Sequence, residues 1–113
     1  MDCIFCKIAA GEVPADILYT DEDVIAFRDI NPQAPVHVLI IPGEHISTLA
    51  ELPEEKATLV GHMVDVANRL ARSEGISESG YRVVINCGKQ GGQLVQHLHM
   101  HLLGGRQLAG SLG

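Results

Sequence analysis

Tryptophan is absent from this sequence of 113 residues, and phenylalanine and tyrosine occur only twice each. Aliphatic side chains must therefore fill the core, and a hydrophobic content of 46% is enough to form one. No apolar run approaches the roughly 20 residues that a membrane-spanning helix needs, so we expect no membrane contact. The N-terminus also lacks the basic and apolar segments of a secretory signal, so we expect a cytoplasmic protein.

Basic residues are scarce: 8 lysines and arginines stand against 14 acidic residues, a net charge of −6 with the six histidines taken as neutral. Nucleic-acid binding is disfavoured, because neutralising phosphates requires clustered lysine and arginine. Only three cysteines are present. Without a secretory signal, we expect them to be reduced thiols or metal ligands rather than a disulfide framework.

The hydrophobic pattern predicts two helices and five strands in one domain over residues 1–113. In chain order these are a short helix over 4–10, strands over 17–19, 24–27 and 36–41, a long helix over 53–75, and strands over 81–86 and 95–103. Short connections favour an antiparallel sheet with the long helix on one face, so the fold class is α+β. Its short strands leave an exposed sheet edge, which indicates a dimer.

The long helix carries the clearest signals. Pro53 suits a first helical position, and Glu54 and Glu55 follow where the helix dipole favours negative charge. Its apolar residues repeat at helical spacing and predict one buried stripe, made of Val60, Met63, Val64, Ala67, Leu70 and Ala71.

Histidine alternates with apolar residues near the C-terminus. On a strand, His97, His99 and His101 share one face, while the other face packs on the core. A half-buried strand with histidines exposed by chance is the alternative, but three in strict alternation argue against it. The first and third Cβ atoms would lie roughly 13 Å apart, too far for all three to bind one metal ion. A row of imidazoles suits phosphate oxygens better, and imidazole is a competent nucleophile toward phosphorus.

A glycine-rich segment over residues 86–93 comes just before these histidines. Successive glycines let backbone N–H groups converge on an anion, although such a turn alone is more often structural. Its position directly ahead of the histidine row favours phosphate binding.

The alternating histidine motif is identified as that of the histidine triad (HIT) superfamily. Residues 27–37 and 91–106 resemble its nucleotide-binding branch, the purine nucleoside phosphoramidases, and the likeness runs over residues 4–107. The resemblance implies a HIT-like antiparallel five-stranded α+β fold that pairs into a dimer with a ten-stranded sheet.

The resemblance also implies site roles. His99 attacks the α-phosphorus of a purine nucleoside 5′-phosphoramidate, and the covalent nucleotidyl-histidine is then hydrolysed to AMP or GMP. His101 contacts the phosphate or leaving group, His37 supports the imidazoles, and Asp29 holds the ribose hydroxyls. The other matched nucleotide contacts are Phe5, Ile8, Phe27, Ile30, Asn86, Gly92, Gln93 and Val95.

In part of the superfamily, a Cys-x-x-Cys pair joins the histidine of a Pro-x-x-His segment and the first triad histidine. The matching residues are Cys3, Cys6, His45 and His97, a donor set suited to a closed structural zinc site. The alternative is that Cys3 and Cys6 pack as small apolar side chains.

The chain departs from the family pattern near the leaving group. Leu94 stands where a serine is frequent, Gln96 replaces a frequent aromatic, and the tail over residues 108–113 lacks a tryptophan found in some relatives. The leaving amine and the choice between adenine and guanine therefore stay open. Alternative functions are a dinucleoside polyphosphate hydrolase and a regulatory module that binds nucleotide or zinc without turnover. His62 is predicted to be a solvated surface residue, and Arg106 to serve the dimer interface or the phosphate.

Overall fold

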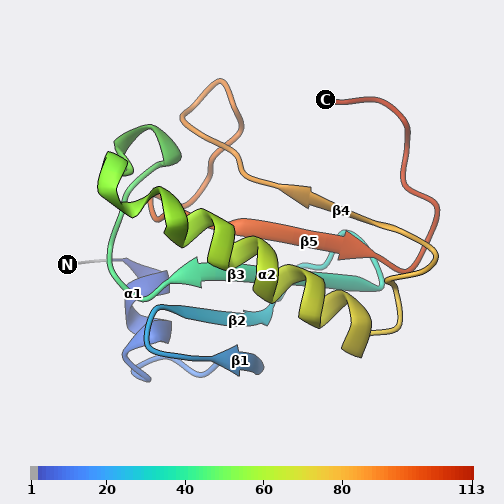
Figure 1. The fold of residues 1–113 in the computed structure, drawn as a ribbon, viewed down its shortest axis with the longest axis horizontal. Helices are drawn as coiled ribbons and strands as arrows, with labels where there is room; N and C mark the ends of the chain where they lie inside the picture. Colours follow the sequence, from blue (N-terminus) through green and yellow to red (C-terminus); the bar gives the residue numbers. More distant parts are fainter. Residues whose placement is uncertain (1–2) are drawn as a thin grey trace.

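Five antiparallel strands form the sheet of the computed structural model, which describes residues 3–113 (Figure 1). Their order across the sheet is β1-β2-β3-β5-β4, which confirms the predicted antiparallel α+β fold. The strands are β1 (Ile17–Thr20), β2 (Val24–Arg28), β3 (Val36–Pro42), β4 (Tyr81–Val84) and β5 (Met100–Gly104). The short helix α1 (Ile4–Ala9) and the long helix α2 (Ala57–Ser73) complete the fold.

The turn between β1 and β2 is organised by one carboxylate. Asp21 Oδ1 accepts hydrogen bonds from the backbone N–H groups of Asp23, at 2.8 Å, and Val24, at 2.9 Å. Such side-chain bonds satisfy backbone N–H groups in the turn that have no partner on a neighbouring strand. The predicted hairpin is confirmed.

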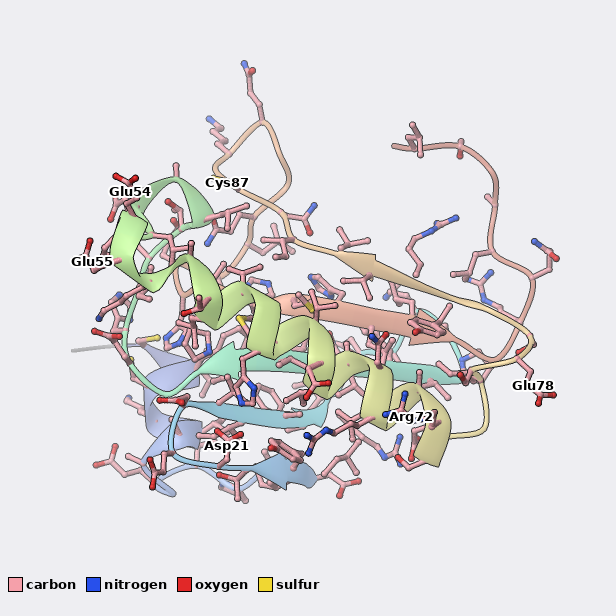
Figure 2. The ribbon with its side chains drawn as sticks, viewed as in Figure 1. Asp21, Glu54, Glu55, Arg72, Glu78 and Cys87 are labelled. Carbon is pink, nitrogen blue, oxygen red and sulfur yellow. The ribbon has the colours of Figure 1, made fainter. Side chains whose placement is uncertain are left out.

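Helix α2 begins later than the sequence predicts. Pro53 has an extended backbone, and Glu54–Lys56 form a separate 3₁₀ turn before the α-helix starts at Ala57. Acidic residues still mark this end and Arg72 the other, as the helix dipole favours (Figure 2).

One position of the predicted buried stripe is wrong. Val64 is 40% exposed, whereas Val66 is fully buried. At 100° per residue, Val66 falls beside Met63 and Leu70, while Val64 falls at the edge of the stripe. None of the helices within residues 3–113 has the length and hydropathy needed to cross a bilayer.

Strand β5 is shorter than predicted, because residues 95–99 are not paired with β3. The ladder ends at the pair Ile40–Met100, two positions before Pro42. Pro42 has no N–H to donate, and its carbonyl accepts a hydrogen bond from the ring of His97 instead. The N–H of Leu98 bonds to the carbonyl of Ile46 at 2.7 Å. Strand β4 likewise ends at Val84, two residues early.

The sheet separates two apolar clusters. The larger cluster lies between the sheet and α2 and includes Val38, Ile40 and Met100. Alternating residues of the same strands form the second cluster on the opposite face, where α1 packs: Cys3, Phe5, Phe27, Leu39 and Ile41, with Ile8 and Val95 beside them. The α1 face is therefore covered by a helix of only six residues, and it carries the site.

Candidate active site

A row of aromatic rings crosses the α1 face of the sheet. His37 on β3 and His101 on β5 have ring centroids 5.2 Å apart, and His99 lies 5.0 Å from His101. Phe5 on α1 continues the row, 5.2 Å from His99 and edge-on to it. The histidines at 37, 99 and 101 are thus brought together as the sequence predicts, even though His99 precedes the paired strand.

The hydrogen bonds of this row set its tautomers. The backbone N–H of Gln33 donates to His37 Nδ1 at 3.0 Å, so the proton of a neutral His37 must be on Nε2. That nitrogen donates to His101 Nδ1 at 2.9 Å. The proton of a neutral His101 is therefore on its Nε2. Asp29 Oδ2 lies 3.4 Å from His37 Nε2 and adds negative charge beside the pair.

His99 has the opposite arrangement. Its Nδ1 lies 2.7 Å from the carbonyl oxygen of His97, which can only accept, so Nδ1 carries the proton. In the neutral ring, Nε2 then carries the lone pair. An imidazole with a buried Nδ1–H and an unprotonated Nε2 is poised for nucleophilic attack.

Burial keeps the supporting histidines neutral. It lowers the pKa of His101 to about 4, helped by the neighbouring His99 and His37. Burial also lowers the pKa of His37, and the carboxylate of Asp29 offsets part of this shift. At neutral pH the His37–His101 pair is therefore uncharged, and His101 presents an N–H donor rather than a full positive charge.

A cavity of about 560 Å³ opens beside this row. Eight of the predicted site residues line it: Phe5, Ile8, Phe27, Asp29, Ile30, His37, Val95 and His101. The wall is mainly apolar, and Ile30 and Leu94 stand at its rim with about 90% of their surface exposed. Arg28 also lines the cavity, but its guanidinium bonds to Glu74 at 2.7 Å and to Asp16 at 3.3 Å.

The glycine-rich segment is held by its own side chains. Gln93 is 6% exposed, and its amide donates to the carbonyls of Ser47 and Val95 and accepts from the N–H of Gly88. Asn86 donates to the carbonyl of Gly91 at 2.7 Å. Asn86, Gly92 and Gln93 are not among the residues that line the cavity, and neither is His99, which lies buried behind Phe5 and His101. In this structure Asn86 and Gln93 bond to backbone groups and so shape the loop.

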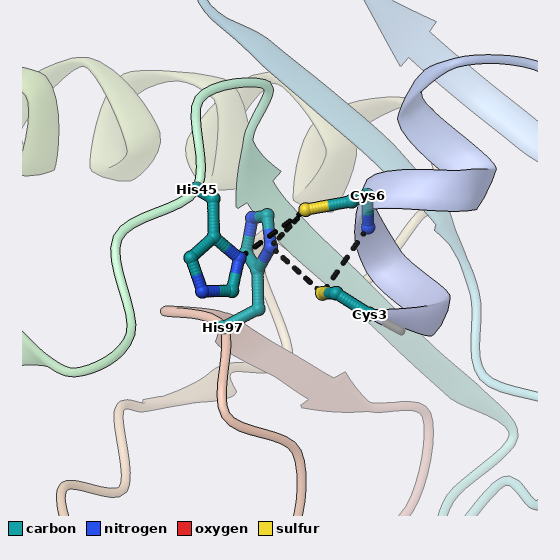
Figure 3. Close-up of side chains that lie close together, drawn as sticks. All are labelled: Cys3, Cys6, His45 and His97. Carbon is teal, nitrogen blue, oxygen red and sulfur yellow. Dashed lines mark hydrogen bonds between the residues drawn. The ribbon is translucent and has the colours of Figure 1, made fainter. Parts of the chain in front are cut away.

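Four sulfur and nitrogen donors converge at the N-terminus of α1 (Figure 3). Cys3, Cys6, His45 and His97 have ligand atoms that all lie within 4.8 Å of one another. Cys3 Sγ is 3.3 Å and Cys6 Sγ 3.5 Å from His97 Nδ1, and Cys6 Sγ is 3.2 Å from His45 Nδ1. In a tetrahedral zinc site, sulfur and nitrogen ligands lie about 3.5 Å apart.

The second nitrogen of His97 supports the same interpretation. His97 Nε2 donates to the carbonyl of Pro42 at 2.8 Å, which leaves the Nδ1 lone pair directed at the thiols. Metal-binding histidines characteristically donate their other N–H to a backbone carbonyl in this way. The donor set and its supporting bond therefore fit a tetrahedral zinc ion.

Sequence reasoning missed the contribution of Gln33 and gave Arg106 a different role, at the dimer interface or the phosphate. The backbone N–H of Gln33 has no side-chain signature, yet it sets the tautomer of His37. Arg106 Nη2 donates to the carbonyl of Gln33 at 2.8 Å and so braces the same loop. A glycine-glycine-arginine run after a strand is a weak signal for such a brace. His62 lies on α2 and pairs with Asp21 at 2.7 Å, remote from the row.

Comparison with known proteins gives one consistent answer. A family model described as the HIT domain matches residues 10–108. The chain is 51% identical to a purine nucleoside phosphoramidase of Escherichia coli, with 95% of this chain and 90% of the relative covered. It is also 51% identical to a 14 kDa zinc-binding protein of Zea mays, with 93% and 83% covered.

A solved structure agrees with these relatives. A HIT family hydrolase from Legionella pneumophila superposes with a TM-score of 0.96 at 49% identity, covering 99% of this chain and all of the other. Sequence and structure therefore show that the chain belongs to the HIT domain family.

Proposed function

We propose that this protein hydrolyses the P–N bond of purine nucleoside 5′-phosphoramidates, releasing AMP or GMP, with His99 as the nucleophile. The observation that carries this proposal is the hydrogen bond from His99 Nδ1 to the His97 carbonyl, because it places the proton of the neutral ring on Nδ1 and the lone pair on Nε2. His99 contacts Phe5 and His101, which both line the cavity. The identity of 51% to the Escherichia coli phosphoramidase supports the same reaction.

In the first step the Nε2 lone pair of His99 attacks the α-phosphorus and the P–N bond breaks. The amine leaves with the bonding electron pair and a proton taken up from solvent, because an unprotonated nitrogen is a poor leaving group. The nucleotidyl-imidazolium that forms keeps its Nδ1–H on the His97 carbonyl, and this bond stabilises the new positive charge. His101 Nε2–H donates to a phosphate oxygen.

In the second step water attacks the same phosphorus. The bond from phosphorus to His99 Nε2 breaks, its electron pair returns to the nitrogen, and the proton lost by water goes to solvent. The proton taken up in the first step is thus returned. Two displacements through an imidazole intermediate replace one difficult hydrolysis.

The cavity supplies the purine and ribose contacts of the proposal. Phe5, Ile8 and Phe27 form an apolar wall that suits a planar base. Asp29 Oδ1 accepts from the N–H of Asn31 at 2.8 Å, which orients its carboxylate. The remaining lone pairs of that carboxylate suit the two hydroxyls of a ribose.

The test is to incubate the protein with adenosine 5′-phosphoramidate and measure AMP. We expect His99→Ala to lower the rate by about 10³-fold or more, since it removes the nucleophile. His62→Ala is the matched control, because this histidine lies on α2 and pairs with Asp21, and it should retain the wild-type rate. Wild type denatured in alkali during turnover, where a P–N bond to histidine survives, should also carry one covalent nucleotidyl group by mass spectrometry.

Three results would contradict the proposal. Equal rates for wild type and His99→Ala would exclude the nucleophile. A higher kcat/KM for a dinucleoside polyphosphate than for the phosphoramidate would favour the polyphosphate hydrolase. Tight AMP binding without any turnover would favour a regulatory module.

We also propose that Cys3, Cys6, His45 and His97 bind a structural zinc ion. The close spacing of the four donors, all within 4.8 Å of one another, supports it, as does the identity to the maize zinc-binding protein. Zinc would hold the two thiolates and two imidazoles in a closed site and leave the chemistry to the triad. A reducing compartment such as the cytoplasm keeps such thiols available. Metal analysis of protein never exposed to chelator should give about one zinc per chain; a value near zero would exclude the site.

A dimer with a ten-stranded sheet completes the proposal. Strand β4 is one edge of the sheet, and Val83 on it is 39% exposed. An unpaired edge of this kind can pair with a second copy of itself. Antiparallel pairing of two β4 strands would join the two five-stranded sheets into one.

A further inference from the structure

Helix α1 contributes to both the metal cluster and the cavity. Cys3, its N-cap residue, and Cys6, within it, provide the two thiols of the cluster. Phe5 and Ile8, on the same helix, line the cavity. The two sites therefore share one helix of six residues, and Cys3 and Phe5 belong to one buried apolar cluster.

Phe5 connects the two sites directly. Its ring packs edge-on against His97 at 6.0 Å and against His99 at 5.2 Å between centroids. It also packs against Phe27, in the wall of the cavity, at 5.6 Å. Phe5 is 7% exposed, so its ring has little freedom to move without shifting these neighbours.

A second connection runs through the backbone of residues 97–99. The ring of His97 belongs to the cluster, while its carbonyl accepts the Nδ1–H that sets the tautomer of His99. The N–H of Leu98 bonds to the carbonyl of Ile46, the residue after His45. Two cluster ligands therefore hold the segment that orients the nucleophile.

Helix α1 cannot be stable by itself. Isolated helices shorter than about 12 residues are marginal in water, so its position depends on what holds it to the sheet. Cys3 Sγ accepts a hydrogen bond from the N–H of Cys6 at 3.3 Å. One thiol of the cluster therefore caps the N-terminus of α1. A metal ion bound to both thiols and to two imidazoles from elsewhere in the chain would fix α1 in place.

We infer that zinc binding at Cys3, Cys6, His45 and His97 and nucleotide binding in the cavity are thermodynamically coupled, with Phe5 as the positioning residue that links them. This inference rests on the proposed function, since it takes the zinc site and the nucleotide site from there. Zinc raises the affinity for AMP by fixing the α1 wall and the His99 tautomer. By linkage, AMP raises the affinity for zinc by the same factor.

The test measures both sides of this linkage. Calorimetry gives the AMP dissociation constant of metal-free and zinc-loaded protein, and chelator competition gives the zinc dissociation constant with and without saturating AMP. Allosteric couplings typically span about 5–150-fold. We expect at least about a fivefold change, equal in the two experiments.

Variants separate the coupling from general damage. Phe5→Leu keeps an apolar side chain but removes the ring that touches His97 and His99, so it should bind zinc and show a coupling below about twofold. Cys6→Ser should lose zinc, and its AMP affinity should no longer respond to the metal. His62→Ala is the control, because this histidine lies on α2 and pairs with Asp21, away from both sites, and it should leave the coupling unchanged.

Each outcome decides between distinct claims. Stoichiometric zinc with an AMP affinity that is unchanged within twofold would overturn the coupling and leave the phosphoramidase proposal intact. Absence of zinc binding would also overturn it. If AMP binds neither form, the proposed function and the coupling both fail, and hydrogen exchange then tests only whether zinc fixes α1. Zinc alone should then slow exchange at the amides of α1 and sharpen the ring NMR signals of His99, and no change in either would contradict it.

Discussion

At the scale of single residues, one backbone amide determines the protonation pattern of the site. The N–H of Gln33 cannot titrate, so it fixes His37 Nδ1 as an acceptor and thereby fixes His101 Nε2 as a donor. Arg106 holds the carbonyl of the same Gln33 residue. In the proposed reaction, the phosphate would therefore meet a defined N–H group of His101 rather than an imidazole free to exchange tautomers.

The lowered pKa of His101 predicts a pH dependence of stability. Its pKa is about 4 in the folded protein and about 6.5 when unfolded, so the unfolded state binds more protons between these values. The free energy of unfolding should therefore fall as the pH drops from 6.5 to 4, by up to about 3 kcal/mol from this group. Urea denaturation of metal-free protein at several pH values measures this slope.

The His101→Gln variant provides the comparison for that slope. It removes the titrating group, so its stability should change less between pH 6.5 and pH 4, by up to about 1.4 kcal/mol per pH unit. Parallel curves for the two proteins would mean that His101 is not buried in its neutral form.

The sequence predicts the identity of these residues better than their hydrogen bonds. Alternation places the histidines at 99 and 101 near one another, and a Cys-x-x-Cys pair with distant histidines indicates a metal site. The tautomer of His37 depends on the backbone N–H of Gln33. Every residue except proline has such a group, so the sequence does not single it out. The side chain of Gln93 likewise bonds three backbone groups that sequence spacing does not bring together.

At the scale of elements, α2 provides a direct test of the corrected buried stripe. Val66 is fully buried and Val64 is 40% exposed, so the same change to alanine should have unequal effects. Val66→Ala leaves a cavity and should lower the free energy of unfolding by about 2 kcal/mol. Val64→Ala should change it by less than about 0.5 kcal/mol. Thermal or urea denaturation distinguishes the two, and equal losses would contradict the stripe seen in the structure.

The sequence predicts the ends of a helix or strand correctly only where residues at those ends mark them. The hairpin around Asp21 has turn residues and flanking apolar runs, and it is confirmed. Strand β5 was predicted five residues too long at its start, because alternation continues through His97 while the pairing partner ends at Pro42. Helix α2 starts late because its first turn after Pro53 is 3₁₀, which differs from the α-helix by only about 10–20° in ψ, and composition does not reveal that difference.

At the scale of the whole molecule, the two edges of the sheet make the dimer proposal testable. Val83 on β4 and Ile17 on β1 are exposed to similar extents, 39% and 43%. A charge on the interface edge blocks strand pairing, so Val83→Lys should convert the dimer to a monomer. Ile17→Lys, on the opposite edge, should leave the dimer intact. Light scattering after size exclusion reports both masses, and the reverse pattern would assign the interface to β1.

The pairing of Arg28 has a consequence for how fast an anionic nucleotide arrives. Arg28 is the only lysine or arginine among the residues of 3–113 that line the cavity, and two carboxylates already neutralise it. With a net charge of −6, the molecule repels the ligand at long range instead of steering it in. Added salt screens that repulsion, so the association rate constant should rise a few-fold between low and physiological ionic strength. Stopped-flow binding of a fluorescent AMP analogue measures it, and a rate that falls with salt would reveal attraction. Such an enzyme would capture nucleotides faster in concentrated electrolyte, the reverse of the usual kinetic salt effect for phosphate-binding proteins.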